Sequence, residues 1–223
     1  MSFNIAIDGP AGAGKSTIAK KVAEKLNFIY VDTGAMYRTI ALSLLRNKVD
    51  CKNETELSHA LDQVEVTIAY EDGNQQVFLN GENVSNQIRT EEVGTMASVS
   101  SACPAVRAKL LNLQRTMAEK FDVLMDGRDI GTQILPEAQL KVYLTASTAA
   151  RAGRRYQELK DKGQECSLEE IEKDMKERDY RDMHRETAPL KQAGDAVLVD
   201  SSDMTIDQVV EKIIGLVQLR REA

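Results

Sequence analysis

The chain has 223 residues, of which 42% are hydrophobic, enough for one well-packed core with a small appended lobe. Its formal net charge of −6 argues against non-specific nucleic-acid binding, and since no apolar run approaches ~18 residues we expect neither a transmembrane helix nor a signal peptide. The three cysteines, Cys51, Cys103 and Cys166, are far apart and lack metal-binding spacing, which predicts a cytoplasmic protein without structural zinc.

A glycine-rich loop between a predicted strand and a predicted helix is the most informative motif. Residues 3–8 (FNIAID) form a short β-rich run, and apolar residues recur at helical spacing over 18–26. Between them, residues 9–17 (GPAGAGKST) complete the G-x-x-x-x-G-K-[S/T] pattern of a phosphate-binding loop. Lys15 can reach the β- and γ-phosphates, and the Ser16 hydroxyl can bind Mg²⁺. We therefore predict a nucleoside triphosphate site made of Gly9, Pro10, Ala11, Gly12, Ala13, Gly14, Lys15, Ser16 and Thr17.

A second strand is predicted over 28–31, followed by a helix that runs to about residue 45. The helix begins within residues 32–38 (DTGAMYR), where Thr33 and the helix N-terminus are candidates for ligand contact and Arg38 projects one turn in. An ordinary capped helix with Tyr37 in the core is an equally open interpretation.

Residues 47–50 (NKVD) match the guanine-specificity pattern of GTPases. They follow a helix instead of a strand, precede any candidate for the second magnesium-binding acid, and have no D-x-x-G switch sequence with them. We interpret them as a helix end and turn.

An antiparallel meander is predicted next. Residues 64–70 alternate with period two, residues 72–74 form a turn, and residues 76–79 continue as a partner strand. The Asn80–Gly81 dipeptide then marks a second turn before residues 82–84. The meander interrupts a chain that otherwise alternates between strands and helices.

Alternation resumes in the second half of the chain, which predicts an α/β fold with ligands at the carboxyl ends of parallel strands. Helical pattern covers 91–120, with Pro104 at the start of the longer helix. The remaining predicted elements are strands at 123–126, 141–145 and 196–199, charged helices at about 148–162 and 167–186, and a closing helix at about 205–220.

Charged residues follow the strand at 123–126. Asp126 stands where an acid that holds Mg²⁺, directly or through water, is expected, although a turn or capping aspartate remains an alternative. Arg128 and Asp129 come next between two glycines, and such a pair is costly to bury without a function.

Arginines cluster on the two charged helices. Arg178, Arg181, Asp182 and Arg185 are spaced to share one helix face, as are Arg151, Arg154 and Arg155. Solvated faces balanced by neighbouring acids remain an alternative, but arginine forks match phosphate oxygens. Since the chain offers many arginines and no obvious general base, we favour a phosphate group as the acceptor.

These motifs make the chain resemble the bacterial cytidylate kinases, in the P-loop nucleoside monophosphate (NMP) kinase group, over essentially its whole length. The resemblance is carried by residues 7–17 (IDGPAGAGKST), 32–38 (DTGAMYR), 126–132 (DGRDIGT), 177–182 (ERDYRD) with Arg185, and 188–190 (APL).

The resemblance implies a doubly wound, parallel five-stranded sheet flanked by helices, with a small antiparallel insert and a short helical LID. It implies a core of about 1–32, 103–147 and 187–223, and an NMP-binding region of about 33–102 that contains the meander. A mobile LID of about 148–166, followed by the arginine-rich helix 167–186, would close over ATP.

The implied reaction transfers the γ-phosphoryl group of ATP to CMP or dCMP, with Mg²⁺, in pyrimidine nucleotide metabolism. The implied catalytic residues are Lys15, Arg128, Arg151 and Arg155. The implied ATP contacts are the glycine-rich loop and Arg154, and the implied magnesium contacts are Ser16 and Asp126. On the acceptor side, Arg38 and Arg128 would grip the phosphate, and Ser98, Arg178 and Asp182 would meet the pentose. Thr33, Arg107, Asp129 and Arg185 would read cytosine, with Asp129 accepting from the exocyclic amine and Tyr37 completing the site.

Two alternatives remain open from the sequence. One is another P-loop small-molecule kinase, of the UMP or shikimate type, and the other is a nucleotide-dependent regulatory protein. For the favoured function we expect the partners to be small nucleotides alone, with no nucleic acid, no membrane and a monomeric chain.

Overall fold

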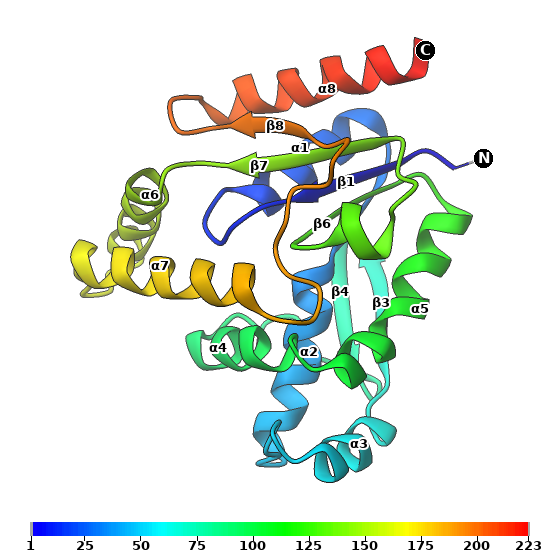
Figure 1. Cartoon of the computed structure of the whole chain (residues 1–223), viewed down its shortest axis with the longest axis vertical. Helices are drawn as coiled ribbons and strands as arrows, with labels where there is room; N and C mark the ends of the chain where they lie inside the picture. Colours follow the sequence, from blue (N-terminus) through cyan, green and yellow to red (C-terminus); the bar gives the residue numbers. More distant parts are fainter. Residues whose placement is uncertain (1, 223) are drawn as a thin grey trace. The chain divides into compact units, whose positions relative to one another are not determined.

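A computed structural model describes residues 2–222, which fall into two compact units (Figure 1). The first unit contains the chain up to Tyr30 and from Lys120 onward, and the second is Val31–Glu119. The glycine-rich loop belongs to the first unit and the meander to the second.

A five-stranded sheet with the order β2-β6-β1-β7-β8 organises the first unit. β1 pairs in parallel with β6 and with β7, and β7 pairs in parallel with β8. The register places Asp8, at the end of β1, opposite Gly127 on β6 and Tyr143 on β7, so these strands end at one edge. The strands are β1 (Asn4–Asp8), β2 (Ile29–Asp32), β6 (Val123–Gly127), β7 (Leu140–Thr145) and β8 (Val197–Asp200). The parallel sheet predicted from the sequence is confirmed.

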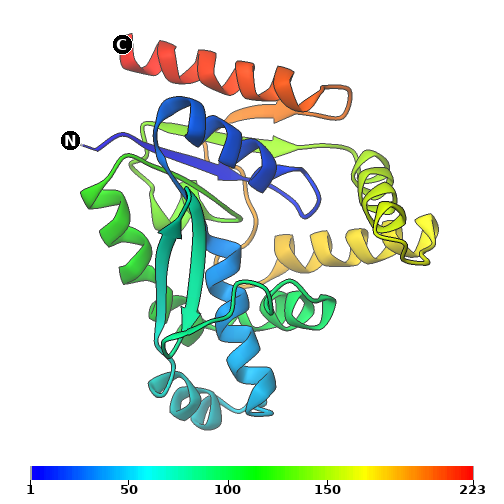
Figure 2. The same ribbon diagram turned by 180° about the vertical axis from the view of Figure 1, so that it is seen from behind.

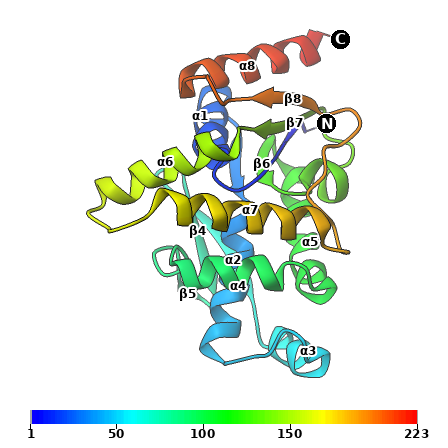
Figure 3. The ribbon, with the colours of Figure 1, turned by 60° about the vertical axis from the view of Figure 1, so that its left-hand side comes forward.

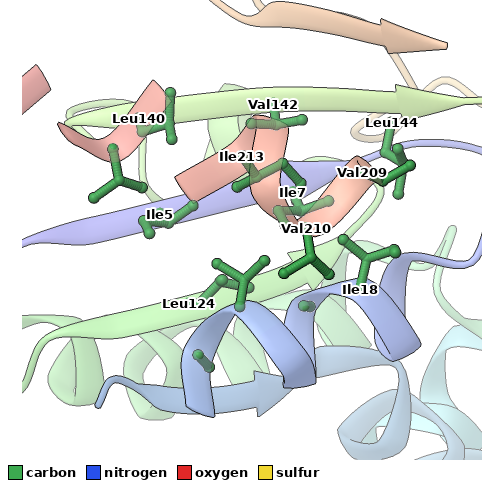
Figure 4. Packing of buried hydrophobic residues seen from close by; sticks show 14 of the residues in the cluster. Ile5, Ile7, Ile18, Leu124, Leu140, Val142, Leu144, Val209, Val210 and Ile213 are labelled. Atoms are coloured by element: carbon green, nitrogen blue, oxygen red, sulfur yellow. The ribbon is translucent and has the colours of Figure 1, made fainter. Parts of the chain in front are cut away.

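Helices α1 (Lys15–Leu26) and α8 (Ile206–Glu222) cover one face of this sheet (Figure 2). Both helices carry apolar residues at helical spacing, and these pack with inward-facing residues of the parallel strands (Figure 4). Members of this core include Ile5, Ile7, Ile18, Leu124, Val142 and Ile213, all at most 3% exposed. The core thereby fixes the start of α1, which is also the end of the glycine-rich loop.

Helices α6 (Thr148–Asp161) and α7 (Leu168–His184) pack side by side in the same unit (Figure 3). Each begins at a serine whose hydroxyl accepts a backbone N–H, Ser147 for α6 and Ser167 for α7. α7 ends two residues before the predicted limit, so Arg185 follows the helix with extended backbone. A single π-helical turn, η1 (Ile130–Ile134), was not predicted and directly follows the Arg128–Asp129 pair.

The second unit contains the predicted meander, β3 (Val66–Glu71), β4 (Asn74–Leu79) and β5 (Glu82–Asn83), paired antiparallel in that order. Its helices are α2 (Thr33–Arg46), α3 (Glu54–Asp62), α4 (Glu91–Ser100) and α5 (Pro104–Lys120). α3 was not predicted, although Asn53 caps it and Leu57 and Leu61 form its buried stripe. α5 groups with this unit.

The residues 47–50 form the predicted helix end and turn, with Asn47 as the C-cap of α2 and Lys48 at φ +54°. Among the helices of residues 2–222, none is both long and apolar enough to cross a membrane.

Candidate active site

The glycine-rich loop connects β1 to α1 through three glycines with positive φ, Gly9 (+152°), Gly12 (+73°) and Gly14 (+82°). A Cβ atom on Gly9 would lie 1.9 Å from the backbone oxygen of Leu144, so only glycine fits there. Gly14 stands at the N-cap position of α1, so the loop leads directly into the positive end of the helix dipole. The loop and the helix start are built to receive an anion.

Lys15 opens α1 and is 6% exposed. Its Nζ donates a 2.8 Å hydrogen bond to the backbone oxygen of Pro10. Burial lowers the pKa of the Lys15 ammonium well below its usual value, and the positive charge of Arg128 lowers it further. The ammonium is therefore buried against the Pro10 carbonyl and destabilised by the charge of Arg128, and phosphate oxygens bound there would stabilise its charged form.

Asp126 accepts two hydroxyl hydrogen bonds at the end of β6. Ser16 Oγ donates to Asp126 Oδ2 at 2.9 Å, and the hydroxyl of Tyr30 donates to Asp126 Oδ1 at 2.9 Å. The carboxylate is 4% exposed and joins the glycine-rich loop, β2 and β6. This set of a hydroxyl and a carboxylate consists of the hard oxygen ligands that Mg²⁺ prefers, so these residues fit a magnesium ion that also binds phosphate.

Within residues 2–222 no group of three or more His, Cys, Asp or Glu side chains is arranged as a metal site. A magnesium ion bound with a nucleotide does not need such a group, since it keeps several waters and takes its other ligands from the phosphates.

Asp8 ends β1 one residue before the loop and is 5% exposed. Its Oδ1 accepts the backbone N–H of Ile130 and its Oδ2 that of Gly131, both at 2.8 Å. Burial raises the pKa of Asp8 to about 6, against the two backbone hydrogen bonds, which lower it. The carboxylate thus connects the donor loop to the turn that follows Arg128 and Asp129.

Two carboxylate–arginine contacts join that turn to α7 and its end. Arg128 Nε donates to Asp182 Oδ2 at 2.9 Å, and Arg185 Nη2 lies 3.6 Å from Asp129 Oδ1. Arg185 Nε also donates to the backbone oxygen of Ala188 at 2.8 Å, which holds the residue that follows α7. The structure therefore brings together four sequence-predicted residues, Arg128, Asp129, Asp182 and Arg185.

The predicted arginine faces are only partly realised. Arg181 is exposed, whereas Asp182 beside it is buried. On α6, Arg154 donates to Ser201 and Arg155 pairs with Glu158, so these two point to different partners.

Arg151 is 3% exposed, and its guanidinium is hydrogen-bonded to several groups of the chain. It donates to the backbone oxygens of Ala146 and Ala11, to Thr148 Oγ1, and to Asp179 Oδ2 at 2.6 Å. It ties α6 to both the glycine-rich loop and α7.

Arg178 lies on α7, in the first unit, whereas the other remaining predicted residues lie in the second unit. Asp32 caps α2 by accepting from Ala35 N at 2.9 Å. Thr33 is buried in the first turn of that helix. Gly34 lets the Arg38 guanidinium approach this turn, because a Cβ there would lie 3.3 Å from Arg38 Nη1.

Arg107, on α5, stacks on the Tyr37 ring of α2 with its central carbon 5.5 Å from the ring centroid. Among the residues described, the buried Ser98 hydroxyl of α4 has no hydrogen-bond partner. This is the state expected of a group that meets a polar ligand.

Three site residues were not among those predicted: Asp8, Tyr30 and Asp179. The position of Asp8, at the carboxyl end of an apolar strand immediately before the glycine-rich loop, is a signal that the sequence did contain. Tyr30 and Asp179 gave no such signal, because their partners are distant in the sequence.

Residues 5–219 match the family model described as "Cytidylate kinase". A protein named cytidylate kinase from Lactobacillus johnsonii is 48% identical over 220 residues, covering 99% of this chain and 96% of that protein. One from Bacillus thuringiensis with the same name is 46% identical over 215 residues, covering 96% of each. An uncharacterized protein from Eubacterium ventriosum has a similar crystal structure, with a TM-score of 0.53 and 14% identity over 97% of this chain and 99% of that chain, which shows the fold alone.

Proposed function

The chain belongs to the cytidylate kinase family, and from this premise we propose how its residues transfer the γ-phosphoryl group of ATP to CMP or dCMP. The observation that carries the proposal is that the segments bearing Lys15 and Arg128 begin at one edge of one sheet, where Asp8 at the end of β1 lies opposite Gly127 at the end of β6. One cation belongs to a triphosphate loop and the other to the Gly-Arg-Asp segment, so a donor and an acceptor phosphate would meet between them.

On the donor side, the backbone N–H groups of residues 9–17 and the start of α1 bind the ATP phosphates. Lys15 leaves the Pro10 carbonyl to reach the β- and γ-phosphates, and Arg154 and Arg155 approach from the LID. Ser16 and Asp126 would hold Mg²⁺, which would neutralise charge on the phosphates. Arg151, which touches the loop carbonyl of Ala11, couples the position of α6 to that of the loop.

On the acceptor side, different side chains bind the phosphate, the base and the sugar of CMP. Arg128 and Arg38 bind its phosphate, and Asp129 accepts from the exocyclic amine of cytosine. The remaining contacts to base and sugar come from Thr33, Tyr37, Ser98, Arg107, Arg178, Asp182 and Arg185.

The chemical step needs positioning and charge stabilisation more than proton transfer. The phosphate of CMP has a second pKa of about 6, so at neutral pH an oxygen of it is already ionised. That oxygen forms a bond to the γ-phosphorus while the bond from the γ-phosphorus to the bridging oxygen of ADP breaks. Lys15 and Arg128 stabilise the charge on the transferred group, and exclusion of water prevents hydrolysis.

We further propose that the enzyme is a cytoplasmic monomer whose partners are ATP, Mg²⁺ and CMP or dCMP. Its three cysteines are free, which suits a reducing compartment. Size-exclusion chromatography with light scattering tests the monomer.

A coupled assay with CMP, dCMP, UMP, AMP and GMP at equal concentration, at fixed MgATP, tests the function. We expect CMP and dCMP to have the highest kcat/KM. Turnover of UMP equal to that of CMP would contradict the assignment, and slow ATP hydrolysis independent of any acceptor would indicate a regulatory protein instead.

A further inference from the structure

An aspartate in the first position of a helical turn normally caps that turn with its own side chain. Asp129 occupies this position for η1, with φ −146° and ψ 27°, yet within residues 2–222 it makes no capping hydrogen bond there. Instead Asp8, which is 121 residues earlier on β1, accepts the first two N–H groups of the turn at 2.8 Å each. Asp8 on β1 therefore caps η1 in place of Asp129.

The consequence of this exchange lies at Asp129. A carboxylate that capped its own turn would point back at the N–H group of Gly131 or Thr132, where it could not accept from a substrate. Asp8 accepts the N–H of Gly131, the Asp129 carboxylate does not cap the turn, and its Oδ1 lies 3.6 Å from Arg185 Nη2. The same two bonds hold the turn that Arg128 precedes.

The turn also packs against the Asp8 side chain. A Cβ on Gly131 would lie 3.2 Å from the side chain of Lys141 and 3.4 Å from Asp8 Oδ2, so the turn is in van der Waals contact with the carboxylate. Both oxygens of Asp8 are thus committed to the turn.

We propose that Asp8 is a positioning residue for base recognition: by capping η1 from β1, it releases Asp129 from local capping and aims that carboxylate at the cytosine amine. The inference rests on the proposed role of Asp129 in CMP recognition. Asp8 itself touches no substrate, and its effect passes through Asp129. It also links the donor loop, one residue away, to the acceptor-binding turn.

Asp8→Asn tests the inference. The amide keeps one acceptor but places an N–H₂ group against the second backbone donor, so one N–H of the turn becomes available to Asp129. We expect the KM for CMP to rise about tenfold, the cost of one lost buried hydrogen bond, with the KM for ATP within about twofold of the wild-type value. The kcat/KM ratio of CMP to UMP should fall, because UMP lacks the exocyclic amine.

A double-mutant cycle separates positioning from general damage. In the Asp129→Ala background, Asp8→Asn should change the CMP:UMP ratio by less than about twofold, since the group through which it acts is gone. The matched control is Asp122→Asn, which removes an exposed carboxylate that also accepts a backbone N–H, from Phe3 at the opposite end of β1, and should leave both constants unchanged.

Equal losses for CMP, UMP and ATP in the Asp8→Asn variant, or an undiminished effect of that change in the Asp129→Ala background, would overturn the inference. If the wild-type protein did not prefer CMP, the proposed function would fail instead. Gly131→Ala, whose Cβ would press on the Lys141 side chain beside Asp8 Oδ2, provides a second variant should Asp8→Asn not fold, and it should lower the CMP:UMP ratio in the same direction.

Discussion

Arg128 and Asp182 form an ion pair, Nε to Oδ2 at 2.9 Å, between the end of β6 and the last turns of α7. The Asp182 side chain is 5% exposed and that of Arg128 is 20% exposed. Burial alone would raise the pKa of Asp182, but the charge of Arg128 and its hydrogen bond outweigh burial and lower the pKa below its usual value. The pair therefore keeps an arginine oriented at the sheet edge before any phosphate binds.

Asp182 should therefore determine the orientation of the Arg128 side chain. Asp182→Asn keeps the shape but removes the charge that holds Arg128, so we expect the KM for CMP to rise about tenfold or more, as for the loss of a charged hydrogen bond. Steady-state kinetics with CMP varied at saturating MgATP measure it. Asp174→Asn, an exposed carboxylate on the same helix, is the control and should behave like the wild type. An unchanged KM for CMP in the Asp182 variant would show that Arg128 is held by other contacts.

Lys15→Met should lower kcat about 10²-fold to 10³-fold, because it removes a charge aimed at the transferred phosphoryl group. Its stability should equal or exceed that of the wild type, since a buried ammonium is replaced by an apolar side chain of similar length. Kinetics and thermal unfolding by circular dichroism measure the two effects. Lys20→Met, exposed on the same helix, should change neither. A loss of fold in the Lys15 variant would argue that the lysine is primarily structural.

Local sequence patterns predicted those parts of the structure that depend on contacts between residues close together in the sequence. The strand, loop and helix around residues 3–26 and the meander follow from short-range pattern. The partners of Asp8, Tyr30 and Arg151 could not be predicted in this way, because each contact joins elements far apart in the sequence.

Helix spacing was similarly incomplete as a guide to function. Arg154 and Arg155 were predicted to share a phosphate-binding face with Arg151, yet each pairs with a neighbour of its own, Ser201 and Glu158. Spacing determines which residues share a helix face, and only the packing of neighbouring elements determines which of them is buried. For the same reason Asp182 is buried while Arg181 is exposed.

The Arg151–Asp179 pair should contribute to stability as well as to the site. Arg151→Met leaves the Asp179 carboxylate buried without its cation, so we expect the free energy of unfolding to fall by about 3–5 kcal/mol. Urea denaturation measures it. The double variant Arg151→Met/Asp179→Asn should recover part of this loss, because it leaves no uncompensated charge.

The same pair of variants separates structure from catalysis at Arg151. If Arg151 also acts on the transferred phosphoryl group, as the resemblance implies, the double variant should regain stability while its kcat remains low. Recovery of both would assign the arginine a structural role alone.

Asp126→Asn should raise the Mg²⁺ concentration needed for half-maximal rate about 10-fold to 100-fold, the usual effect of disturbing groups around a metal. The charge of the carboxylate is lost while its bonds from Ser16 and Tyr30 are partly kept. The measurement is the initial rate against Mg²⁺ at fixed ATP and CMP. Tyr30→Phe removes only the second of those bonds and should have a smaller effect. An unaltered Mg²⁺ dependence in the Asp126 variant would remove Asp126 from the magnesium site.

The pKa of Asp8 predicts how pH changes stability. Burial raises that pKa to about 6 in the folded chain, against an ordinary value of 3.8 that applies to the unfolded chain. Below pH 3.8 the group is neutral in both states and its stabilising contribution is complete. As pH rises from 3.8 to 6 only the unfolded chain releases the proton, so this contribution is lost over that window and stays lost above it.

The loss amounts to about 3 kcal/mol, from a pKa difference near two units at about 1.4 kcal/mol each. Asp8→Asn cannot titrate, so the wild-type free energy of unfolding minus that of the variant should fall by about this amount between pH 4 and pH 7. Lys15, Asp129 and Tyr143 also face Asp8 electrostatically, and all three are present in both proteins. Urea denaturation at pH 4, 5, 6 and 7 measures the difference. If this free-energy difference is constant with pH, Asp8 titrates alike in the folded and unfolded chains. If the difference rises with pH, the two backbone hydrogen bonds from Ile130 and Gly131 outweigh the burial of Asp8.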